Sequence, residues 1–145
     1  MADRRDPYTG FNFMVELDGL TRAGFKEASG IETSVQVFDY REGTDVGNIA
    51  RKLPGQNQAS TITLRRGISD DRALYDWHRK AATGSVDRRT ISIVLRDETG
   101  AEKIRWNIKN AWPSKWTGPS LDAGSNDVAI EALELVHEGL EVQKW

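Results

Sequence analysis

The chain has two histidines, and histidine is the side chain that most often takes the proton from a catalytic serine or cysteine. His78 falls on the apolar side of a predicted helix, and His137 lies near the end of the sequence. There is no cysteine among the 145 residues, and no serine occupies the Gly-x-Ser-x-Gly pattern of a nucleophile elbow. We interpret both histidines as packed structural residues and expect no catalytic residue.

Two pairs of acidic residues could divide acid and base roles, as paired carboxylates do in glycoside hydrolases. Asp70 and Asp71 stand at the start of the predicted helix, where acids suit the helix dipole. Glu131 and Glu134 fit a solvated strand face. These structural roles explain both pairs, and a hydrolase whose site the sequence does not reveal is kept only as an alternative.

Metal and nucleotide sites need donor sets that this sequence lacks. Two isolated histidines without cysteine do not form a zinc-ligand pattern, and there is no Asp/Asn-rich calcium loop. The glycine-containing stretch "YREGTDVGNIARKLPGQ" ends in Arg51 and Lys52, but Pro54 prevents the helix that a phosphate-binding loop requires. We expect no metal and no cofactor.

The segment "RWNIKNAWPSKW" places tryptophans beside lysine and arginine, as in stacking sites for single-stranded nucleic acid or sugars. Trp106 alternates with two isoleucines, which predicts a core position. Trp112 and Trp116 bracket a proline after the predicted strand, and this pattern favours a packed corner or a subunit contact over a ligand platform. A β-barrel module that binds nucleic acid or carbohydrate is the second alternative.

The length indicates a single domain, residues 1–145, and the absence of cysteine fits a protein made in the cytoplasm. The net charge is −2 with acids and bases interleaved, so no one-sided basic surface is indicated. The sequence has neither the apolar core of a secretion signal at its start nor an apolar run long enough to cross a bilayer, and we expect no membrane anchor.

Alternating apolar residues predict a mainly β protein. "FNFMVEL" and "LTRAGFKEAS" should form a hairpin around Asp18-Gly19. "TISIVLRD" and "EKIRWNIKN" should form a second hairpin around "DETG", and "TSVQVFDY" and "STITLRR" are further strands. The tail, 127–138, contains strong helix formers and also alternates; we assign it as a strand because an open sheet edge needs covering.

One helix is predicted over residues 69–83. Leu74, Trp77 and Ala81 share its apolar side, with Ser69 as N-cap and Gly84 as the C-terminal stop. The opposite, polar side should face outward and carries Arg72, Asp76, Arg79 and Lys80.

The ordered set of segments "VELDGL", "DYREGTD", "RKLPG", "TITLRRGI", "YDWHRK", "NAWPSKWTGPSLDA" and "VAIEALELVHEGLE" resembles the inner tail-tube protein of contractile phage tails and extracellular contractile injection systems. The resemblance runs from about Phe11 to Leu140, and it extends more distantly to the tube protein of type VI secretion. It also supports the strand assignment of the tail.

The resemblance implies a β-barrel or sandwich of two packed antiparallel sheets with one flanking helix. It implies hexameric rings of this chain that stack into a tube, with DNA or protein cargo in the lumen. Sheath, baseplate and tail-terminator proteins would be the partners in a phage tail or phage-like particle made in the bacterial cytoplasm. No chemistry by this subunit is implied.

In the resembling family a long inter-strand loop, here residues 41–55, reaches neighbouring subunits, with glycines supplying bends and charges supplying register. The predicted interface residues are Arg41, Glu42, Gly43, Asp45, Gly47, Arg51, Lys52, Pro54, Trp112 and Trp116. The polar side of the helix would face the sheath.

Overall fold

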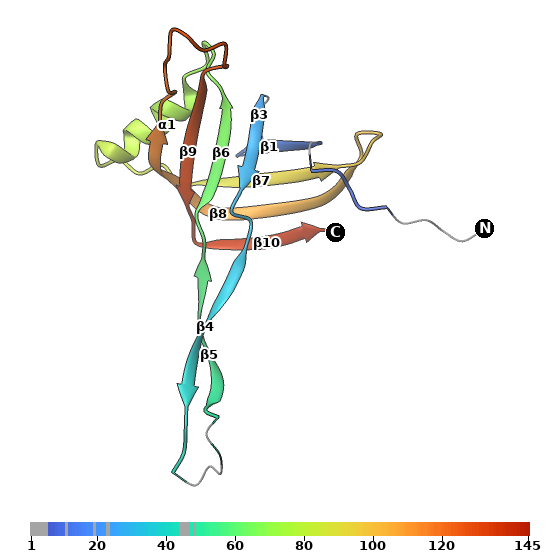
Figure 1. Cartoon of the computed structure of the whole chain (residues 1–145), viewed down its shortest axis with the longest axis vertical. Helices are drawn as coiled ribbons and strands as arrows, with labels where there is room; N and C mark the ends of the chain where they lie inside the picture. Colours follow the sequence, from blue (N-terminus) through green and yellow to red (C-terminus); the bar gives the residue numbers. More distant parts are fainter. Residues whose placement is uncertain (1–5, 11, 19, 23, 44–46, 48) are drawn as a thin grey trace, which may run out of the picture.

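The computed structural model describes residues 6–10, 12–18, 20–22, 24–43, 47 and 49–145. Figure 1 shows a body of strands with one helix, from which a long two-stranded ribbon projects. The elements are β1 (Phe13–Leu17), β2 (Leu20–Arg22), β3 (Phe25–Ser29), β4 (Thr33–Tyr40), β5 (Arg51–Ala59), β6 (Ile62–Gly67), α1 (Ala73–Ala82), β7 (Arg89–Arg96), β8 (Glu102–Thr117), β9 (Ile130–Val136) and β10 (Gly139–Lys144).

The body is a sandwich of two antiparallel layers that share the long strand β8. The strand order is β2-β1-β7-β8-β9-β6-β3, and β10 pairs with the first half of β8. β8 pairs with β7 as far as Ala111 and with β9 from Trp112 onward, and Asn110 has a positive φ of 51° where the strand changes layers. Among the described residues β2 and β3 do not pair, so the predicted sandwich is confirmed and the barrel is not closed.

The core lies between the layers and follows the predicted alternation. Val15, Ile62, Leu64, Ile91 and Ile108 are fully buried. Helix α1 packs against β8. The buried residues of the helix are Leu74 and Trp77, and both belong to the same hydrophobic core.

Helix α1 is shorter than predicted, and its predicted N-cap is wrong. Ser69 Oγ accepts a hydrogen bond from the Asp71 N–H (3.2 Å), and Asp71 Oδ1 accepts one from the Ala73 N–H (3.0 Å). Two successive side-chain turns therefore delay the start of the helix to Ala73. Gly84, with φ +91°, is the predicted stop at the other end.

The first predicted hairpin is confirmed only in part. β1 pairs with β2 around Asp18, whose φ is 52°, while Gly19 lies outside the described residues. The predicted second arm is two strands, because the chain turns at Gly24 (φ +85°) and β3 then pairs with β6. The second hairpin, β7–β8, is confirmed, and Asp97 Oδ1 accepts the N–H groups of Thr99 and Ala101 in its turn.

The tail is a strand, as assigned, and the helical alternative is wrong. β9 buries Glu131, Leu133 and Leu135, with half-buried residues between them. The chain then turns at His137 and Glu138 and forms β10 along β8.

The long loop of residues 41–55 is the largest correction. Residues 51–55 belong to β5, and Pro54 lies opposite Val37 in the β4–β5 ribbon, next to a register shift. Proline is tolerated there because each ribbon strand has a partner on one side only, so the missing N–H can face outward. Only residues 41–50 connect the two strands.

Candidate subunit-contact surfaces

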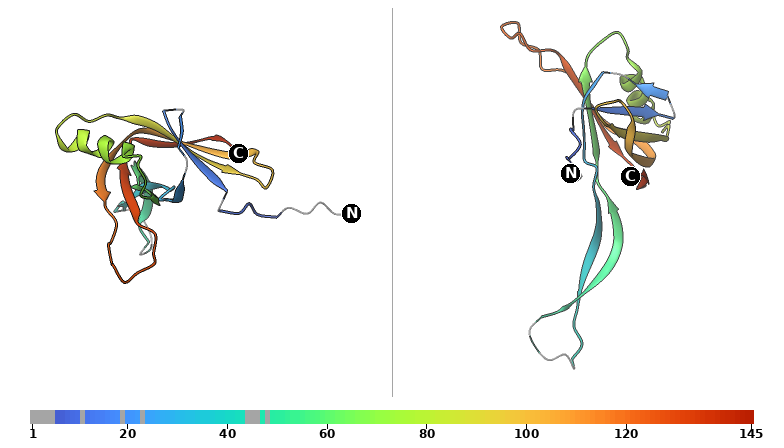
Figure 2. Two further views of the ribbon diagram at one scale, coloured as in Figure 1. Left: turned by 90° about the horizontal axis from the view of Figure 1, so that it is seen from above. Right: turned by 90° about the vertical axis from the view of Figure 1, so that its right-hand side faces the viewer.

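The ribbon exposes apolar side chains on both faces. Every residue of β4 is exposed, including Val35 and Val37 on one face and Phe38 on the other. The exposed fraction of Val37 is 61%. Figure 2 shows that no other element of the body lies against the outer half of the ribbon. Apolar surface displayed in this way marks an interaction site more often than a free surface.

The Phe38 ring lies against Gly55 of the opposite ribbon strand. A Cβ placed on Gly55 would come within 2.3 Å of the Phe38 ring. Gly55 therefore allows the cross-strand ring to lie on the backbone, and it also lies at the register shift of the ribbon. Gly47, with φ +117°, is a bend as predicted.

Several charges predicted to set register between subunits make contacts within this chain. Arg41 Nη2 donates to the Gly47 carbonyl (2.5 Å), and Lys52 pairs with Asp39 across the ribbon. Glu42 Oε1 accepts a hydrogen bond from the Tyr40 hydroxyl (3.0 Å). Asp45 lies outside the described residues. These contacts lie within one chain, and the intersubunit role of these residues stays a prediction.

The polar side of α1 points to solvent. Its four predicted outward residues are all exposed, namely Arg72, Asp76, Arg79 and Lys80. Arg72 and Asp76 form an ion pair one turn apart (3.2 Å), and Lys80 lies 3.6 Å from Asp87. The outward orientation is confirmed, and contact with a sheath stays a prediction.

A buried ion pair inside the body was missed from the sequence. Arg66 Nε donates to Glu131 Oε1 (2.6 Å), and Arg66 also contacts the Asp71 carboxylate (3.1 Å). Both partners of the first contact are almost fully buried, so the solvated position predicted for Glu131 is wrong. The signal was available: Arg66 has the same strand parity as the core residues Ile62 and Leu64.

The two histidines and the two acidic pairs, which are the candidate catalytic groups of the sequence, do not come together in one site. His78 Nδ1 lies 3.2 Å from the Pro113 carbonyl, whereas His137 Nδ1 accepts the Gly139 N–H at the corner between β9 and β10. Glu134 points to the opposite face of β9 from Glu131. Among the described residues no group of three or more acidic or histidine side chains could hold a metal ion. Their one helix is too short and too polar to cross a bilayer.

Comparisons with known proteins identify the family of the chain. The family model of the T4-like virus tail tube protein gp19 matches residues 9–141. The chain belongs to this tail tube family. Among proteins with curated functions, none matches the sequence.

Solved structures agree with the family assignment. The anti-feeding prophage cap, described as a tube terminating cap, is 33% identical, with a TM-score of 0.90 over 100% of this chain and 96% of that chain. A sheath-tube complex of the extracellular contractile injection system PVC, in its extended state, is also 33% identical, with a TM-score of 0.86 over 96% and 93%. Hcp1 from Flavobacterium johnsoniae, at 12% identity and a TM-score of 0.59 over 93% and 97%, shares the fold.

In this tail tube protein the two predicted contact tryptophans differ. Trp116 donates from Nε1 to Glu131 Oε2 (3.2 Å) and packs edge-on against Tyr75, with ring centroids 5.0 Å apart. It therefore ties α1 to the sheet within one chain. Trp112 is half-buried opposite Val136. Both lie inside β8 rather than after it, and their role between subunits stays a prediction.

Strands β1, β7 and β8 carry polar side chains on the face that points away from the core, and several of these side chains contact one another. Arg105 donates to Glu16 (2.6 Å) and also pairs with Glu102. The Arg105 hydrogen bond is the main reason that the pKa of Glu16 lies below its ordinary value. Ser92 donates to Asn107 Oδ1 (2.7 Å). On this face Arg105 is therefore paired with two carboxylates of the same chain.

Proposed function

We propose that the chain is the structural subunit of the inner tube of a contractile phage tail or phage-like injection system. Hexameric rings of the subunit stack into a tube, and DNA or protein cargo passes through its lumen. The observation that carries the proposal is the β4–β5 ribbon, which displays apolar residues on both faces. Membership of the tail tube family supports it.

The ribbon needs a partner for physical reasons. A two-stranded ribbon without a covering layer is marginally stable in water. Val35, Val37 and Phe38 would gain about 25 cal/mol for each Å² of apolar surface that a neighbouring subunit covers. A head-to-tail contact between identical subunits closes into a ring when its rotation is fixed, and it extends into a stack when it is repeated along an axis.

The remaining partners follow from the other surfaces. The charged side of α1 would meet the sheath, and the ends of the tube would meet baseplate and tail-terminator proteins. The subunit would be made in the bacterial cytoplasm and carry out no catalysis. Support for the last point comes from the separation of His78 and His137 and from the structural roles of Glu131 and Trp116.

The experiment shortens the ribbon and examines both fold and assembly. One variant replaces residues 36–56 by Asn-Gly, so that Val35 and Asn57, which already pair, are joined by a two-residue turn. The matched variant replaces only residues 41–50 by Asn-Gly, joining Tyr40 to Arg51. Circular dichroism and thermal melting report the fold, and negative-stain electron microscopy reports tubes.

We expect the first variant to keep a folded body and to form no tubes, because the core does not include the ribbon. The second variant removes only the tip of the ribbon, residues 41–50, and keeps both ribbon strands. If it also fails to form tubes, the predicted contact residues at the tip are needed. Normal tubes from the first variant would contradict the proposal, and a native chain that stays monomeric at high concentration would favour a binding module or a hydrolase.

A further inference from the structure

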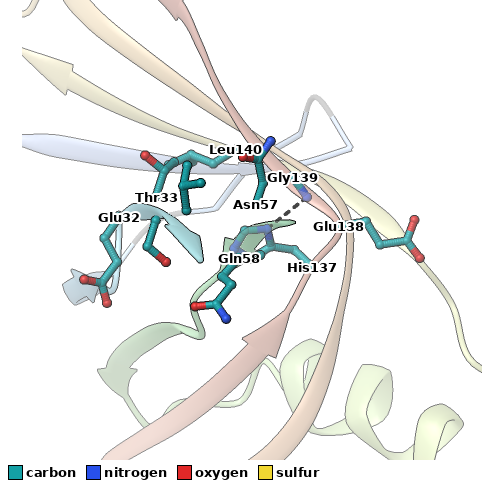
Figure 3. A pocket seen from close by; sticks show the side chains of 11 residues that line it. Glu32, Thr33, Asn57, Gln58, His137, Glu138, Gly139 and Leu140 are labelled. Carbon is teal, nitrogen blue, oxygen red and sulfur yellow. Dashed lines mark hydrogen bonds between the residues drawn. The ribbon is translucent and has the colours of Figure 1, made fainter. Parts of the chain in front are cut away.

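A pocket of about 330 Å³ lies where the ribbon leaves the body. Figure 3 shows it between the inner end of the ribbon, represented by Thr33 and Gln58, and the corner between β9 and β10 at His137 and Gly139. Leu140 and Val35 supply apolar lining. The volume is near the lower end of the range for small-molecule pockets and suits one apolar side chain with its adjoining backbone.

His137 gives this pocket a polar group in need of an acceptor. The Gly139 N–H donates to Nδ1 (3.2 Å), so the proton of a neutral imidazole belongs on Nε2. That nitrogen is buried and has no hydrogen-bond partner among the described residues. Gln58, whose side chain lies beside the ring in Figure 3, is exposed and can move aside. The His137 ring lines the pocket, and a backbone carbonyl oxygen there could accept the Nε2–H only after displacing the groups that cover this nitrogen.

The opposite end of the molecule carries a second projection, the outer loop (residues 118–129). It points away from the body in the direction opposite to the ribbon (Figure 1). Leu121 has an exposed fraction of 82%. The loop is ordered by its own contacts, because Asp122 Oδ1 accepts the Gly124 N–H (3.0 Å) and Ser125 Oγ accepts the Asp127 N–H (3.1 Å). The outer loop therefore has hydrogen bonds of its own and exposes the Leu121 side chain to solvent.

We infer that the pocket at the base of the ribbon receives Leu121 and the adjoining backbone of the outer loop from a second copy of this chain, the next subunit along the stack. This inference rests on the proposed tube. The outer loop and the ribbon base lie at opposite ends of the body, and the ribbon projects beyond its base (Figure 1). In a head-to-tail stack in which each ribbon runs alongside the next body, the outer loop of one copy would therefore meet the ribbon base of the next.

A disulfide test is sharp because the chain contains no cysteine. The variant carries Leu121→Cys and Gln58→Cys, both at exposed positions. Gln58 lies in β5 at the ribbon base, and the outer loop that carries Leu121 lies at the other end of the body (Figure 1). The two cysteines of one chain therefore cannot join each other, and any bridge links different copies. Preassembled tubes are oxidised briefly and run on a non-reducing gel.

The expected result is a ladder that extends beyond the dimer, since every copy would bond to one neighbour on each side. Each single variant can give dimers at most, and tubes mixed from the two single variants should give dimers only. Tubes of the double variant that show no ladder would overturn the inference and leave the proposed function standing. If the native chain forms no tubes, the proposed function and the inference both fall.

Two further variants test the occupant. Leu121→Asp should require at least about tenfold more protein for tube formation, because a leucine anchor is lost. Val128→Asp, on the same loop and also exposed, is the matched control and should assemble normally. A ladder from Trp145→Cys with Gln58→Cys, in place of the Leu121 ladder, would overturn the inference and assign the pocket to the chain's C-terminal end.

Discussion

In the body, alternate residues of β6 and β9 are buried against a second layer and a helix, whereas in the ribbon every residue of β4 is exposed. Both regions contain antiparallel strand pairs. The difference lies in what covers them. A strand whose apolar residues meet a layer of the same chain contributes to folding, and a strand whose apolar residues meet water is available for assembly.

The two regions should therefore respond differently to mutation. Substitutions in the body should lower the free energy of unfolding, and substitutions in the ribbon should lower assembly with little change in that free energy. Measuring both quantities on each variant tests this division of roles.

The largest expected loss is for Trp77→Ala. The Trp77 side chain is 1% exposed, and its Nε1 donates to the Asp87 carbonyl (2.6 Å). Removing it should cost about 3–5 kcal/mol of the free energy of unfolding, as for other buried aromatics. Urea unfolding with an unchanged m-value measures the loss. Trp145→Ala, at an 84% exposed position, is the control and should change stability by less than about 0.5 kcal/mol. A loss below 1 kcal/mol for Trp77→Ala would contradict the packing of α1.

The next largest effect compares two adjacent arginines. Arg66→Met leaves Glu131 buried without its ionic partner and should cost about 3–5 kcal/mol. Arg65→Met removes only the half-exposed pair with Glu27 and should cost about 0–1 kcal/mol. The same urea titration measures both.

Adding Glu131→Leu to Arg66→Met should recover much of the loss, because a buried pair can be replaced by apolar groups. Equal losses from the two arginine variants would show that burial does not decide the cost.

Much of the body could be predicted from the sequence, because its patterns are local. The alternation in Ile62 and Leu64, the stripe of Leu74 and Trp77, and the turn at Asp97 each reflect a few neighbouring residues. The layer change within β8 could not be predicted in this way. It depends on β9 taking over from β7 as the partner at Trp112, which is a long-range pairing.

The sequence located the candidate contact segment, residues 41–55, but not its secondary structure. Glycines, charges and Pro54 in residues 41–55 suggested an irregular arm, and the pairing of Pro54 with Val37 shows that most of the arm is regular. Glu131 was placed in solvent because its charge outweighed its parity with Leu133. Its partner Arg66 lies 65 positions away in the sequence, so only the fold brings the compensating charge to it.

A smaller effect is expected from pH through Glu16. Hydrogen bonding to Arg105 lowers the Glu16 pKa in the folded chain below its ordinary value of 4.5. The contact therefore stabilises the fold fully above about pH 4.5, and this stabilisation is lost as the pH falls through the lower, folded-state pKa. Glu16→Gln should cost about 1 kcal/mol at pH 7.

Melting temperatures between pH 7 and pH 3 measure this dependence, and Glu16→Gln should reduce its slope below pH 4.5. Glu98→Gln, in the exposed turn between β7 and β8, is the control and should change stability by less than about 0.5 kcal/mol. An unchanged slope in Glu16→Gln would show that other carboxylates determine the acid response of the body.

The smallest expected change in stability belongs to the ribbon. Val37→Ser alters a side chain that is mostly in water, so the free energy of unfolding should change by less than about 0.5 kcal/mol. Tube formation should nevertheless fail, because the contact that we propose between subunits at Val37 would lose its apolar group. Val37→Ile keeps that group and should form tubes. Urea unfolding and electron microscopy of the same preparations separate the two effects. If Val37→Ser lowers stability as much as a core substitution does, the ribbon belongs to the folding unit and the contrast between the two regions is wrong.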